Sequence, residues 1–458
     1  MPALLPGKVE ARRVVPNLQE SSRGRFLTTA ALVSVVLILL ILGGLPIFLA
    51  LGVAGMAGLF LVRGSAALSL APTSFFGQLS SFEMIALPLF ILMGHTLAAT
   101  PIGRDLFLAA SRWLSWLRGG LAIASVGACT AFGAVSGVSI AGVASVGALA
   151  VPEMIERGYS RSIAAGAVVT AGALAMLIPP SVPFIIYAAV SGESVAKLFI
   201  GGIVPGIALA LALSVFIYAR VWLRPEEAPD HASESYSWRE RLASLKDVWH
   251  VILLIVWVLG SIYTGIATPT EASAVGAMGA LLVAGLIYRV LTLPRLFDIL
   301  KQSLRVSAAI LLIMGCAKIF GDFLNLVRVP QTLAEALLGL DVPEMAILLA
   351  LMALLIVLGM FVDAVSLIVV TTPILLPLIV GMGYDPLWFG IILVINLEIA
   401  VVTPPVGLNL YTLRGVCPFL RIEEIIRSSI PFVLIQILVL IVFTLFPPLS
   451  LWLPGTLD

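Results

Sequence analysis

The hydrophobic pattern of the chain consists of long apolar runs separated by short stretches of charged and turn-forming residues. A helix needs about 20 mainly apolar residues to cross a bilayer core ~30 Å thick, and many of the runs approach that length. The pattern therefore predicts an all-α protein that crosses a membrane repeatedly. The predicted full spans are Phe26–Leu42, Pro46–Val62, Met84–Leu97, Ile163–Val190, Leu198–Leu223, Val251–Tyr263, Ala272–Tyr288, Ser307–Phe320, Leu387–Leu413 and Ser429–Leu453.

Two further apolar blocks do not have the length of a simple crossing. Residues 119–152 form a run of 34 without a charge, which as one helix would extend about 51 Å. A break, AVSGVS (Ala134–Ser139), falls near its middle, so we predict a re-entrant hairpin of two half-helices whose tip is satisfied by protein or water. The pattern recurs over residues 344–384, with GMFVDAVS (Gly359–Ser366) at the turn. Both tips are expected near the middle of the bilayer.

The hairpins and the helices that follow them belong to an internal repeat. Val151–Tyr187 aligns with Leu376–Tyr411 at an offset of 225 residues, and such repeats are common in membrane transporters. With about five spans and one hairpin in each half, the second half must begin on the opposite side of the membrane, so the repeats are inverted. The matching residues are Pro152 with Pro377, Gly158–Tyr159 with Gly383–Tyr384, Pro179–Pro180 with Pro404–Pro405 and, after one deletion, Tyr187 with Tyr411.

The domain organisation and the orientation follow from this alignment. Most of the 26 Lys and Arg residues fall in loops on one side, which the positive-inside rule assigns to the cytoplasm. The basic N-terminal tail opposes this assignment, so the side of the N-terminus stays open. The predicted parts are a polar tail (1–25), a first inverted repeat (26–222) with a hairpin at about 119–152 and a broken helix at about 163–190, a cytoplasmic linker (223–250), and a second inverted repeat (251–458) with a hairpin at about 344–384 and a broken helix at about 387–413.

Composition supports a polytopic membrane protein and excludes other classes. Hydrophobic residues make up 60% of the chain and charged residues 11%, with a mean hydropathy of +1.14, far from the values of soluble domains. The three cysteines have no disulfide or zinc spacing. The net charge of +1 and the lack of a basic tract give no indication of a nucleic-acid partner.

The paired prolines mark helices that are interrupted inside the membrane. A proline in a helix removes a hydrogen bond and frees a carbonyl, which is tolerated in lipid only where protein, an ion or water takes up the backbone. Pro179–Pro180 and Pro404–Pro405 therefore predict two broken helices, each facing a hairpin tip. Half-helix ends meeting there offer carbonyls to a cation and N-terminal dipoles to an anion. The alternative is that each pair only kinks a packed helix.

At these motifs the chain resembles a known family, the large membrane (permease) subunit of tripartite ATP-independent periplasmic (TRAP) transporters, also called DctM-like. The resemblance extends from about Leu37 onward. It implies a bacterial inner-membrane secondary transporter of elevator type that is driven by a sodium gradient, with a fold similar to sodium-coupled dicarboxylate symporters. The motifs are LPLFILMG (Leu87–Gly94), GAVSGVSIA (Gly133–Ala141), ALAVPEMIERGYS (Ala148–Ser160), LIPPSVPFIIY (Leu177–Tyr187), FVDAVSLIVVTTPILLP (Phe361–Pro377) and NLEIAVVTPPVGLNLY (Asn396–Tyr411).

The resemblance also implies where sodium binds, because the ion sites of the family lie at the hairpin tips. Backbone carbonyls and hydroxyls at such positions suit a hard cation. One position departs from the family, since Val138 stands where a serine is common and a hydroxyl is missing. Either this position contributes only backbone or the first site differs in strength. The candidate sodium residues are Ser136, Gly137, Val138, Ser139, Thr170, Gly172, Gly359, Met360, Asp363, Asn396, Glu398 and Ala400.

An organic acid is expected between the two tips, where neutral donors and helix ends favour a carboxylate. The candidate substrate residues are Ser139, Pro180, Ser181, Thr403, Pro405 and Asn409. Ser181 and Thr403 could equally cap or back-bond a broken helix, whereas Asn409 on an apolar half-helix favours a functional role.

The intramembrane ionisable residues are functional hypotheses by default. Glu398 could bind a cation or a proton, or act as a structural hydrogen-bond partner. Asp363 could approach an ion, but we favour a helix cap. Lys318 and Asp322, four residues apart, are interpreted as a structural pair, and His95 as structural.

The remaining alternatives concern the class of function and the partners. No catalytic motif is present, because AVSG lacks the first glycine of a Gly-x-Ser-Gly site and no membrane histidine follows it, so an enzyme is not expected. A stand-alone sodium/carboxylate symporter is the alternative to a binding-protein-dependent subunit. No cofactor is expected besides sodium as the coupling ion. The predicted partners are a small membrane subunit on a separate chain, a periplasmic substrate-binding protein, the organic acid and membrane lipid.

Overall fold

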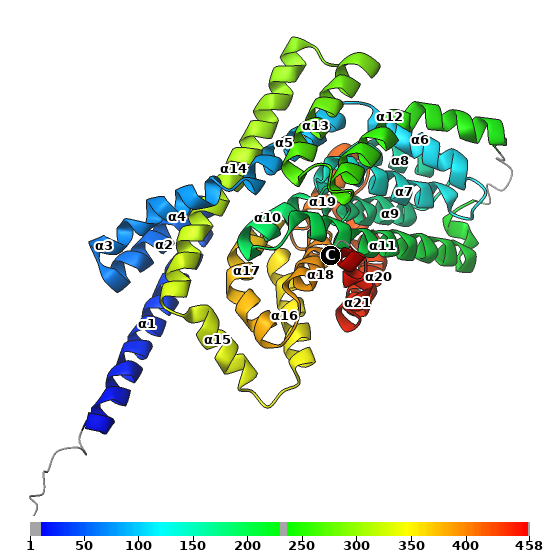
Figure 1. Cartoon of the computed structure of the whole chain (residues 1–458). Coiled ribbons are helices and arrows are strands. Elements are labelled where there is room, and N and C mark those ends of the chain that lie inside the picture. The colour runs from blue at the N-terminus through cyan, green and yellow to red at the C-terminus, as the bar shows by residue number, and fades with distance from the viewer. Residues whose placement is uncertain (1–10, 230–235, 457–458) are drawn as a thin grey trace, which may run out of the picture.

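A computed structural model describes residues 11–229 and 236–456, and within these ranges the regular structure is helical and contains no strand (Figure 1). The all-α prediction is therefore confirmed. The elements are α1 (Ala11–Leu42), α2 (Ile47–Arg63), α3 (Ser65–Leu68), α4 (Leu70–Leu79), α5 (Glu83–Ala98), α6 (Ile102–Leu114), α7 (Gly120–Ser136), α8 (Ser139–Glu156), α9 (Arg161–Ala173), η1 (Leu174–Met176), α10 (Val182–Ser191), α11 (Val195–Leu223), η2 (Pro225–Glu227), α12 (Trp238–Tyr263), α13 (Pro269–Leu282), η3 (Val283–Ile287), α14 (Leu293–Leu326), α15 (Val329–Leu338), α16 (Glu344–Gly359), α17 (Ala364–Gly381), α18 (Pro386–Val401), α19 (Leu408–Val416), α20 (Ile422–Leu445), α21 (Pro448–Leu451) and η4 (Pro454–Thr456).

Several of these helices are long and apolar enough to cross a membrane. By length and composition there are 7 in the described residues, or 8 if the helices Ser65–Leu79 and Glu83–Ala98, bent by 55°, count as one span. Of the shorter apolar helices, α9, α10 and α18 belong to other predicted spans, and α16 belongs to the predicted second hairpin. The prediction of a polytopic membrane protein is confirmed.

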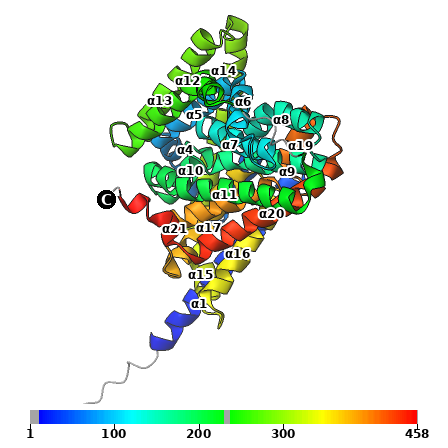
Figure 2. The ribbon, with the colours of Figure 1, turned by 90° about the vertical axis from the view of Figure 1, so that its right-hand side faces the viewer.

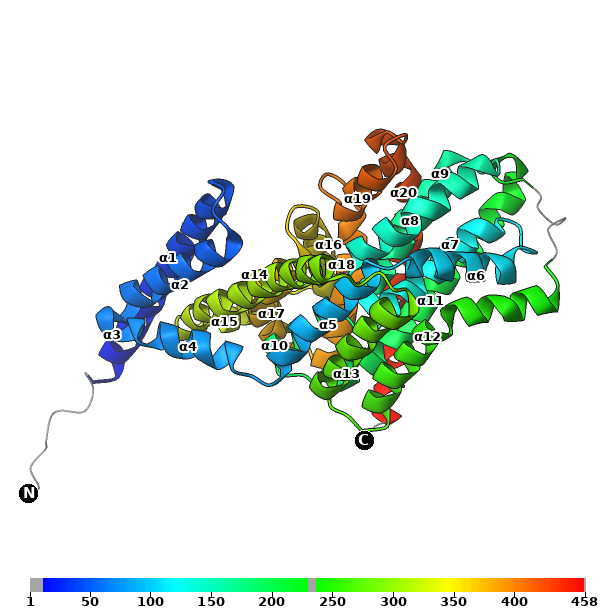
Figure 3. The same ribbon diagram turned by 90° about the horizontal axis from the view of Figure 1, so that it is seen from above.

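An elongated arm is built from α1 to α4 against the long helix α14 (Figures 1 and 3). The arm is held by glycines on α2 that let the backbones approach closely. A Cβ at Gly55 would lie 2.8 Å from the backbone nitrogen of Phe320, and one at Gly58 would lie 2.5 Å from the ring of Phe323. Small residues at a membrane helix interface permit such contact, so α2 and α14 form one packed unit.

The interior of the main body is formed by α9 and α18, the helices that precede the two proline pairs. Every residue from Ile163 to Ala173 in α9, and from Leu387 to Val401 in α18, is buried. The helices α11 and α20, which come after α10 and α19 in the chain, pack against each other across the body (Figure 2). The predicted broken helices therefore lie at the centre of the molecule.

Two predicted boundaries are corrected. Helix α1 begins at Ala11, inside the stretch interpreted as a polar tail, whose residues 1–10 lie outside the described residues. The predicted linker, of which residues 230–235 also lie outside them, turns helical at Trp238. The reason is a capping box in which Ser237 and Glu240 satisfy each other's backbone N–H groups, which lengthens the span predicted to begin at Val251.

Candidate functional site

The first hairpin tip lies directly on the first helix interruption. Helix α7 ends at Ser136, Gly137 has a left-handed φ of 61°, and α8 begins at Ser139 after the extended residue Val138. A Cβ at Gly137 would collide with the carbonyl oxygen of Pro180. Glycine is thus required here both by φ and by space.

Backbone and side-chain groups at this tip are largely engaged locally. The Val138 N–H donates to the Ser136 hydroxyl at 3.5 Å, and the Val138 carbonyl accepts from Gly142 at 3.4 Å. The Thr170 hydroxyl donates to the Gly166 carbonyl at 2.7 Å. Gly172 is packed so closely on Val143 that a side chain there would collide. The sequence predicted Thr170 and Gly172 for sodium, and the structure gives both a packing or back-bonding role as well.

The two half-helices on either side of the first interruption are linked by the hydroxyl of Ser181. After α9 and the turn η1, the segment Leu177–Ser181 is not helical, and the Pro179–Pro180 peptide is cis. The Ser181 hydroxyl donates to the Met176 carbonyl and accepts from the Phe184 N–H at 3.5 Å. Ser181 is thus the N-cap of α10, the capping role that the sequence left open beside ligand contact.

The second tip and the second interruption meet in the same way. The Val406 N–H donates to the Met360 carbonyl at 3.3 Å, and a Cβ at Gly359 would lie 2.6 Å from the Cβ of Ala400. The Pro404–Pro405 peptide is cis, and the Thr403 hydroxyl donates back to the Ile399 carbonyl at 2.5 Å. Each tip therefore contacts the interruption of its own repeat.

Asp363 at the second tip is a helix cap. Its carboxylate accepts from the Ser366 N–H at 3.0 Å and from the Ser366 hydroxyl at 2.6 Å. This is the cap that the sequence favoured. Both carboxylate oxygens already hold a donor of α17, which lowers their availability for an ion.

Asn409 links the first tip to both broken helices. Its Oδ1 accepts from the Ser139 hydroxyl at 2.8 Å, and its Nδ2 donates to the Val169 carbonyl at 3.2 Å. Asn409 is completely buried. The sequence predicted Ser139 and Asn409 in one site but missed Val169, because any residue carries a backbone carbonyl and no side-chain signal marks it.

Two side chains on α18 present unpaired oxygens in the interior. Asn396 Nδ2 donates to the Met352 carbonyl at 2.8 Å, while its Oδ1 and both carboxylate oxygens of Glu398 have no hydrogen-bond partner among the described residues. Both side chains are completely buried. An unpaired buried carboxyl is costly, so Glu398 is a candidate for binding a cation or a proton.

The two interruptions differ in accessibility. Every residue of Leu177–Ser181 is buried, whereas Pro405 and Val406 are exposed, as is Phe361 at the second tip. The second interruption therefore lies nearer the surface of the chain than the first.

The chemistry of the site is that of neutral oxygen ligands. In the described part of the chain no group of three or more His, Cys, Asp or Glu residues could hold a metal. The remaining donors are hydroxyls, amides and the carbonyls of interrupted helices, a set suited to a hard monovalent cation rather than to a transition metal. His95 bonds Ser303 at 3.1 Å, and Lys318 bonds Asp322 at 2.9 Å, which matches their structural interpretation.

An all-helical membrane core in which interrupted helices meet two helical tips defines the class of polytopic membrane transporters. In agreement, the fold is similar to that of the YdaH transporter of Alcanivorax borkumensis, with a TM-score of 0.58, 15% identity and coverage of 85% of this chain and 90% of that one. It is also similar to Neisseria gonorrhoeae MtrF, with a TM-score of 0.58, 13% identity and coverage of 93% and 95%. At these identities the likeness shows the fold alone.

The sequence model of the tripartite ATP-independent periplasmic transporter family, DctM component, matches residues 34–449, and the chain belongs to this family. It is 33% identical to the C4-dicarboxylate TRAP transporter large permease protein DctM of Vibrio cholerae, over 93% of this chain and 98% of that protein. It is 37% identical to the DctM protein of Pseudomonas aeruginosa, over 89% and 94%. Identity to the isethionate permease protein DctMQ of Oleidesulfovibrio alaskensis is 37% over 90% of this chain, which spans 64% of that relative's length. The relatives are permeases, so the expectation of a transporter rather than an enzyme is confirmed.

Proposed function

We propose that the chain couples sodium influx to the uptake of a small organic acid by elevator-type alternating access in the bacterial inner membrane. A periplasmic substrate-binding protein delivers the acid, and a small membrane subunit on a separate chain completes the transporter. Membership of a tripartite family supports both partners. The relatives named for C4-dicarboxylates and isethionate support an anionic organic substrate.

The observation that carries this proposal is the meeting of tips and interruptions at one centre. Gly137 lies on Pro180, Met360 bonds Val406, and Asn409 ties Ser139 to Val169. Such irregular backbone at membrane depth is tolerated where it lines a binding cavity.

Substrate and ion have complementary positions in this proposal. The N-termini of α10 at Ser181 and of α19 at Gly407 attract a carboxylate through their helix dipoles. Carbonyls at the tips and the unpaired oxygens of Asn396 and Glu398 attract sodium. Pro180 and Pro405 keep both helices interrupted, and this interruption places the N-termini of α10 and α19 inside the site.

Uptake by proteoliposomes tests the proposal. The chain is reconstituted with its small subunit, and labelled organic acids are offered with and without an inward sodium gradient and the periplasmic binding protein. Uptake that requires both the gradient and the binding protein is expected. Sodium-driven uptake without the binding protein would favour the stand-alone symporter, and uptake indifferent to sodium would refute the coupling.

The substrate can be identified separately. A panel of organic acids is tested for thermal stabilisation of the purified binding protein, because a ligand that binds only the folded state raises its melting temperature. The acid that stabilises it is then used for the uptake measurement.

A further inference from the structure

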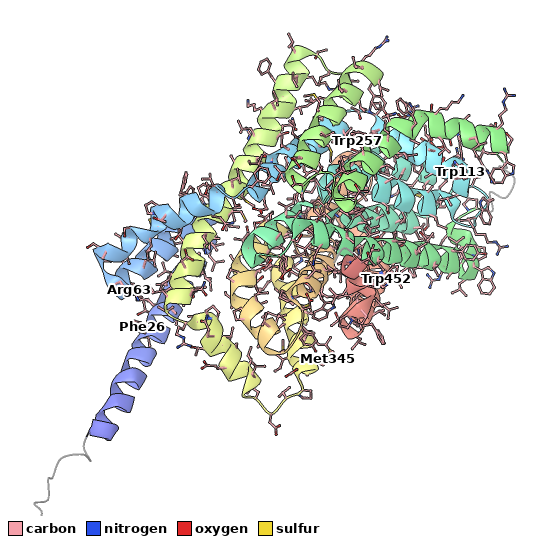
Figure 4. The ribbon with its side chains drawn as sticks, viewed as in Figure 1. Phe26, Arg63, Trp113, Trp257, Met345 and Trp452 are labelled. Atoms are coloured by element: carbon pink, nitrogen blue, oxygen red, sulfur yellow. The ribbon has the colours of Figure 1, made fainter. Side chains whose placement is uncertain are left out.

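An apolar groove of about 450 Å³ runs between α12 and the pair α13 and η3, away from the central site. Both walls belong to helices that are long and apolar enough to cross a membrane. Trp257, labelled in Figure 4, lies on the rim. We propose that this groove binds an acyl chain of an anionic phospholipid whose headgroup lies beside Lys246 and Arg289.

The groove has the shape that an acyl chain requires. Gly276 and Gly279 lie one turn apart on α13 and carry no side chain of their own, so the apolar side chains of α12 lie close to its backbone. A Cβ at Gly276 would lie 3.1 Å from Val258 Cγ2, and one at Gly279 would lie 3.2 Å from Leu254 Cδ1. The rim consists of side chains that are more than half exposed, Trp249 at 53%, Trp257 at 60% and Leu286 at 70%. Burying methylenes among them is favourable, by about 0.8 kcal/mol for each CH₂.

One end of the groove is fixed by a hydrogen-bonded chain of three side chains. Tyr288, which follows η3, donates to Asp105 Oδ2 of α6 at 2.6 Å and accepts from His250 Nε2 of α12 at 3.0 Å. This chain ties both walls together beside His250. Polar groups therefore begin where the apolar lining ends, as at a membrane–water interface.

Positive charge gathers at that same end. Lys246 lies one turn before His250 on the groove face of α12, and Arg289 directly follows Tyr288; both are exposed and form no ion pair among the described residues. Of the nearby carboxylates, Asp105 already holds Tyr288, and Asp247 lies 3.8 Å from Arg112. Basic residues between membrane helices recognise anionic headgroups, and tryptophan at this level is typical of the interface.

The charge pattern favours a lipid over a helix of a partner subunit. An apolar partner helix would fill the groove but leave the two cations at its end unmatched. An anionic phospholipid satisfies the apolar lining and the cations together, which is why we assign the groove to it.

Fluorescence quenching tests the assignment on the full chain in phosphatidylcholine vesicles. Brominated phosphatidylglycerol or brominated phosphatidylcholine is added. The chain has eight tryptophans, so the quenching that is lost when Trp249→Phe and Trp257→Phe are introduced together reports lipid in the groove. The variants are Lys246→Gln with Arg289→Gln, which removes the headgroup charges, and Gly279→Leu, which fills the groove. Arg305→Gln on α14 and Gly260→Leu on α12, where a Cβ meets no atom within 4 Å, are the matched controls.

Preferential quenching by phosphatidylglycerol is expected in the wild type and both controls. The charge variant should lower this preference roughly 30-fold, since each cation near an anionic lipid contributes about 1 kcal/mol. Gly279→Leu should reduce groove quenching by both lipids. Equal quenching by the two lipids in the wild type, or an unchanged preference in the charge variant, would overturn the proposal. Loss of quenching when the small subunit is bound would show a protein occupant instead and overturn it as well.

Discussion

Asn409 joins three elements through one amide group, and this makes it a positioning residue at the centre of the molecule. It holds the Ser139 hydroxyl at the first tip and the Val169 carbonyl of α9 from its place on α19. A buried amide with both ends satisfied fixes the geometry of its neighbours. The first tip and the second broken helix are thus held together across the repeats.

Asn409→Ala is expected to lower both stability and uptake. The change leaves the Val169 carbonyl and the Ser139 hydroxyl without their partner, which costs about 1–3 kcal/mol. Thermal unfolding in detergent and uptake in proteoliposomes measure the two effects. A double-mutant cycle with Ser139→Ala should show a coupling above about 0.5 kcal/mol, and additive effects would contradict the link. Thr412→Ala on the same helix, at a partly buried position away from these contacts, is the control.

Glu398→Gln separates the ion-binding role from the structural one. Glutamine keeps the shape of the side chain but cannot carry the charge, so a sodium ligand would be weakened. We expect the sodium concentration for half-maximal uptake to rise about tenfold or more, a change of about 1.4 kcal/mol, with stability unchanged or higher. Uptake assayed over a range of sodium concentrations measures this. The exposed Glu344→Gln is the control and should keep the sodium dependence of the native chain. An unchanged sodium dependence in Glu398→Gln would show that Glu398 is not a sodium ligand.

The interruptions of α9–α10 and α18–α19 are the elements on which the site depends. In the first repeat Gly137 of the tip contacts the interrupted segment at Pro180. In the second repeat Met360 of the tip bonds the interrupted segment at Val406. The interrupted segments expose backbone groups that a continuous helix would pair within itself. In the proposed mechanism, transport requires that these few residues are not helical.

Pro404→Ala with Pro405→Ala is expected to favour a continuous helix through the second interruption. Alanine restores the missing N–H and removes the ring that clashes with the preceding turn. Helix content by circular dichroism should be kept or raised while uptake is lost. Pro448→Ala at the start of α21, where a proline breaks no helix, is the control and should keep uptake. Full uptake by the double variant would show that the interruption is not needed.

At the scale of the whole molecule, the arm with α14 faces the second hairpin across a cleft. A cavity of about 270 Å³ lies between them, lined by Lys318 and Asp322 of α14 and by Pro373 and Pro377 of α17. Beside it, a Cβ at Gly321 would lie 4.0 Å from the Cβ of Pro373. A loosely filled contact of this kind is where one body could move past another.

Cross-linking α14 to α17 tests the elevator mechanism. The Cβ separation at Gly321 and Pro373 suits a disulfide, so Gly321→Cys with Pro373→Cys, in a background with Cys316→Ala, should form one on oxidation. If the hairpin moves relative to α14, oxidation stops uptake and a reductant restores it.

A second cross-link controls for oxidation itself. Gly52→Cys in the native chain places a Cβ 3.6 Å from that of Cys316, which links α2 to α14 within the arm. Because these helices form one packed unit, uptake should continue after oxidation. Uptake that persists in the oxidised α14–α17 variant would contradict elevator movement of the hairpin.

Much of the fold could be predicted from the amino-acid sequence, because the bilayer strongly constrains helix length and backbone hydrogen bonding. Apolar length predicted the membrane helices, and the paired prolines marked the segments that are not helical in the structure. The tip residues Gly137 and Asp363 were identified from sequence, and the cap at Asp363 follows from its place before α17. The inversion of the repeats stays a prediction. The early start of α12 was missed, since its first turns are polar and only the Ser237 capping box marks them.

The sequence alone determined the membrane class, the family and the two interruptions, because hydropathy, proline chemistry and motif spacing are local properties. Only the tertiary structure decided which groups meet, Val169 with Asn409 and Met360 with Val406, and that the Glu398 carboxylate has no hydrogen-bond partner among the described residues. These contacts join residues far apart in the chain, often through backbone atoms that every residue has. Partners of that kind carry no signature in sequence, and they exist only once the helices pack.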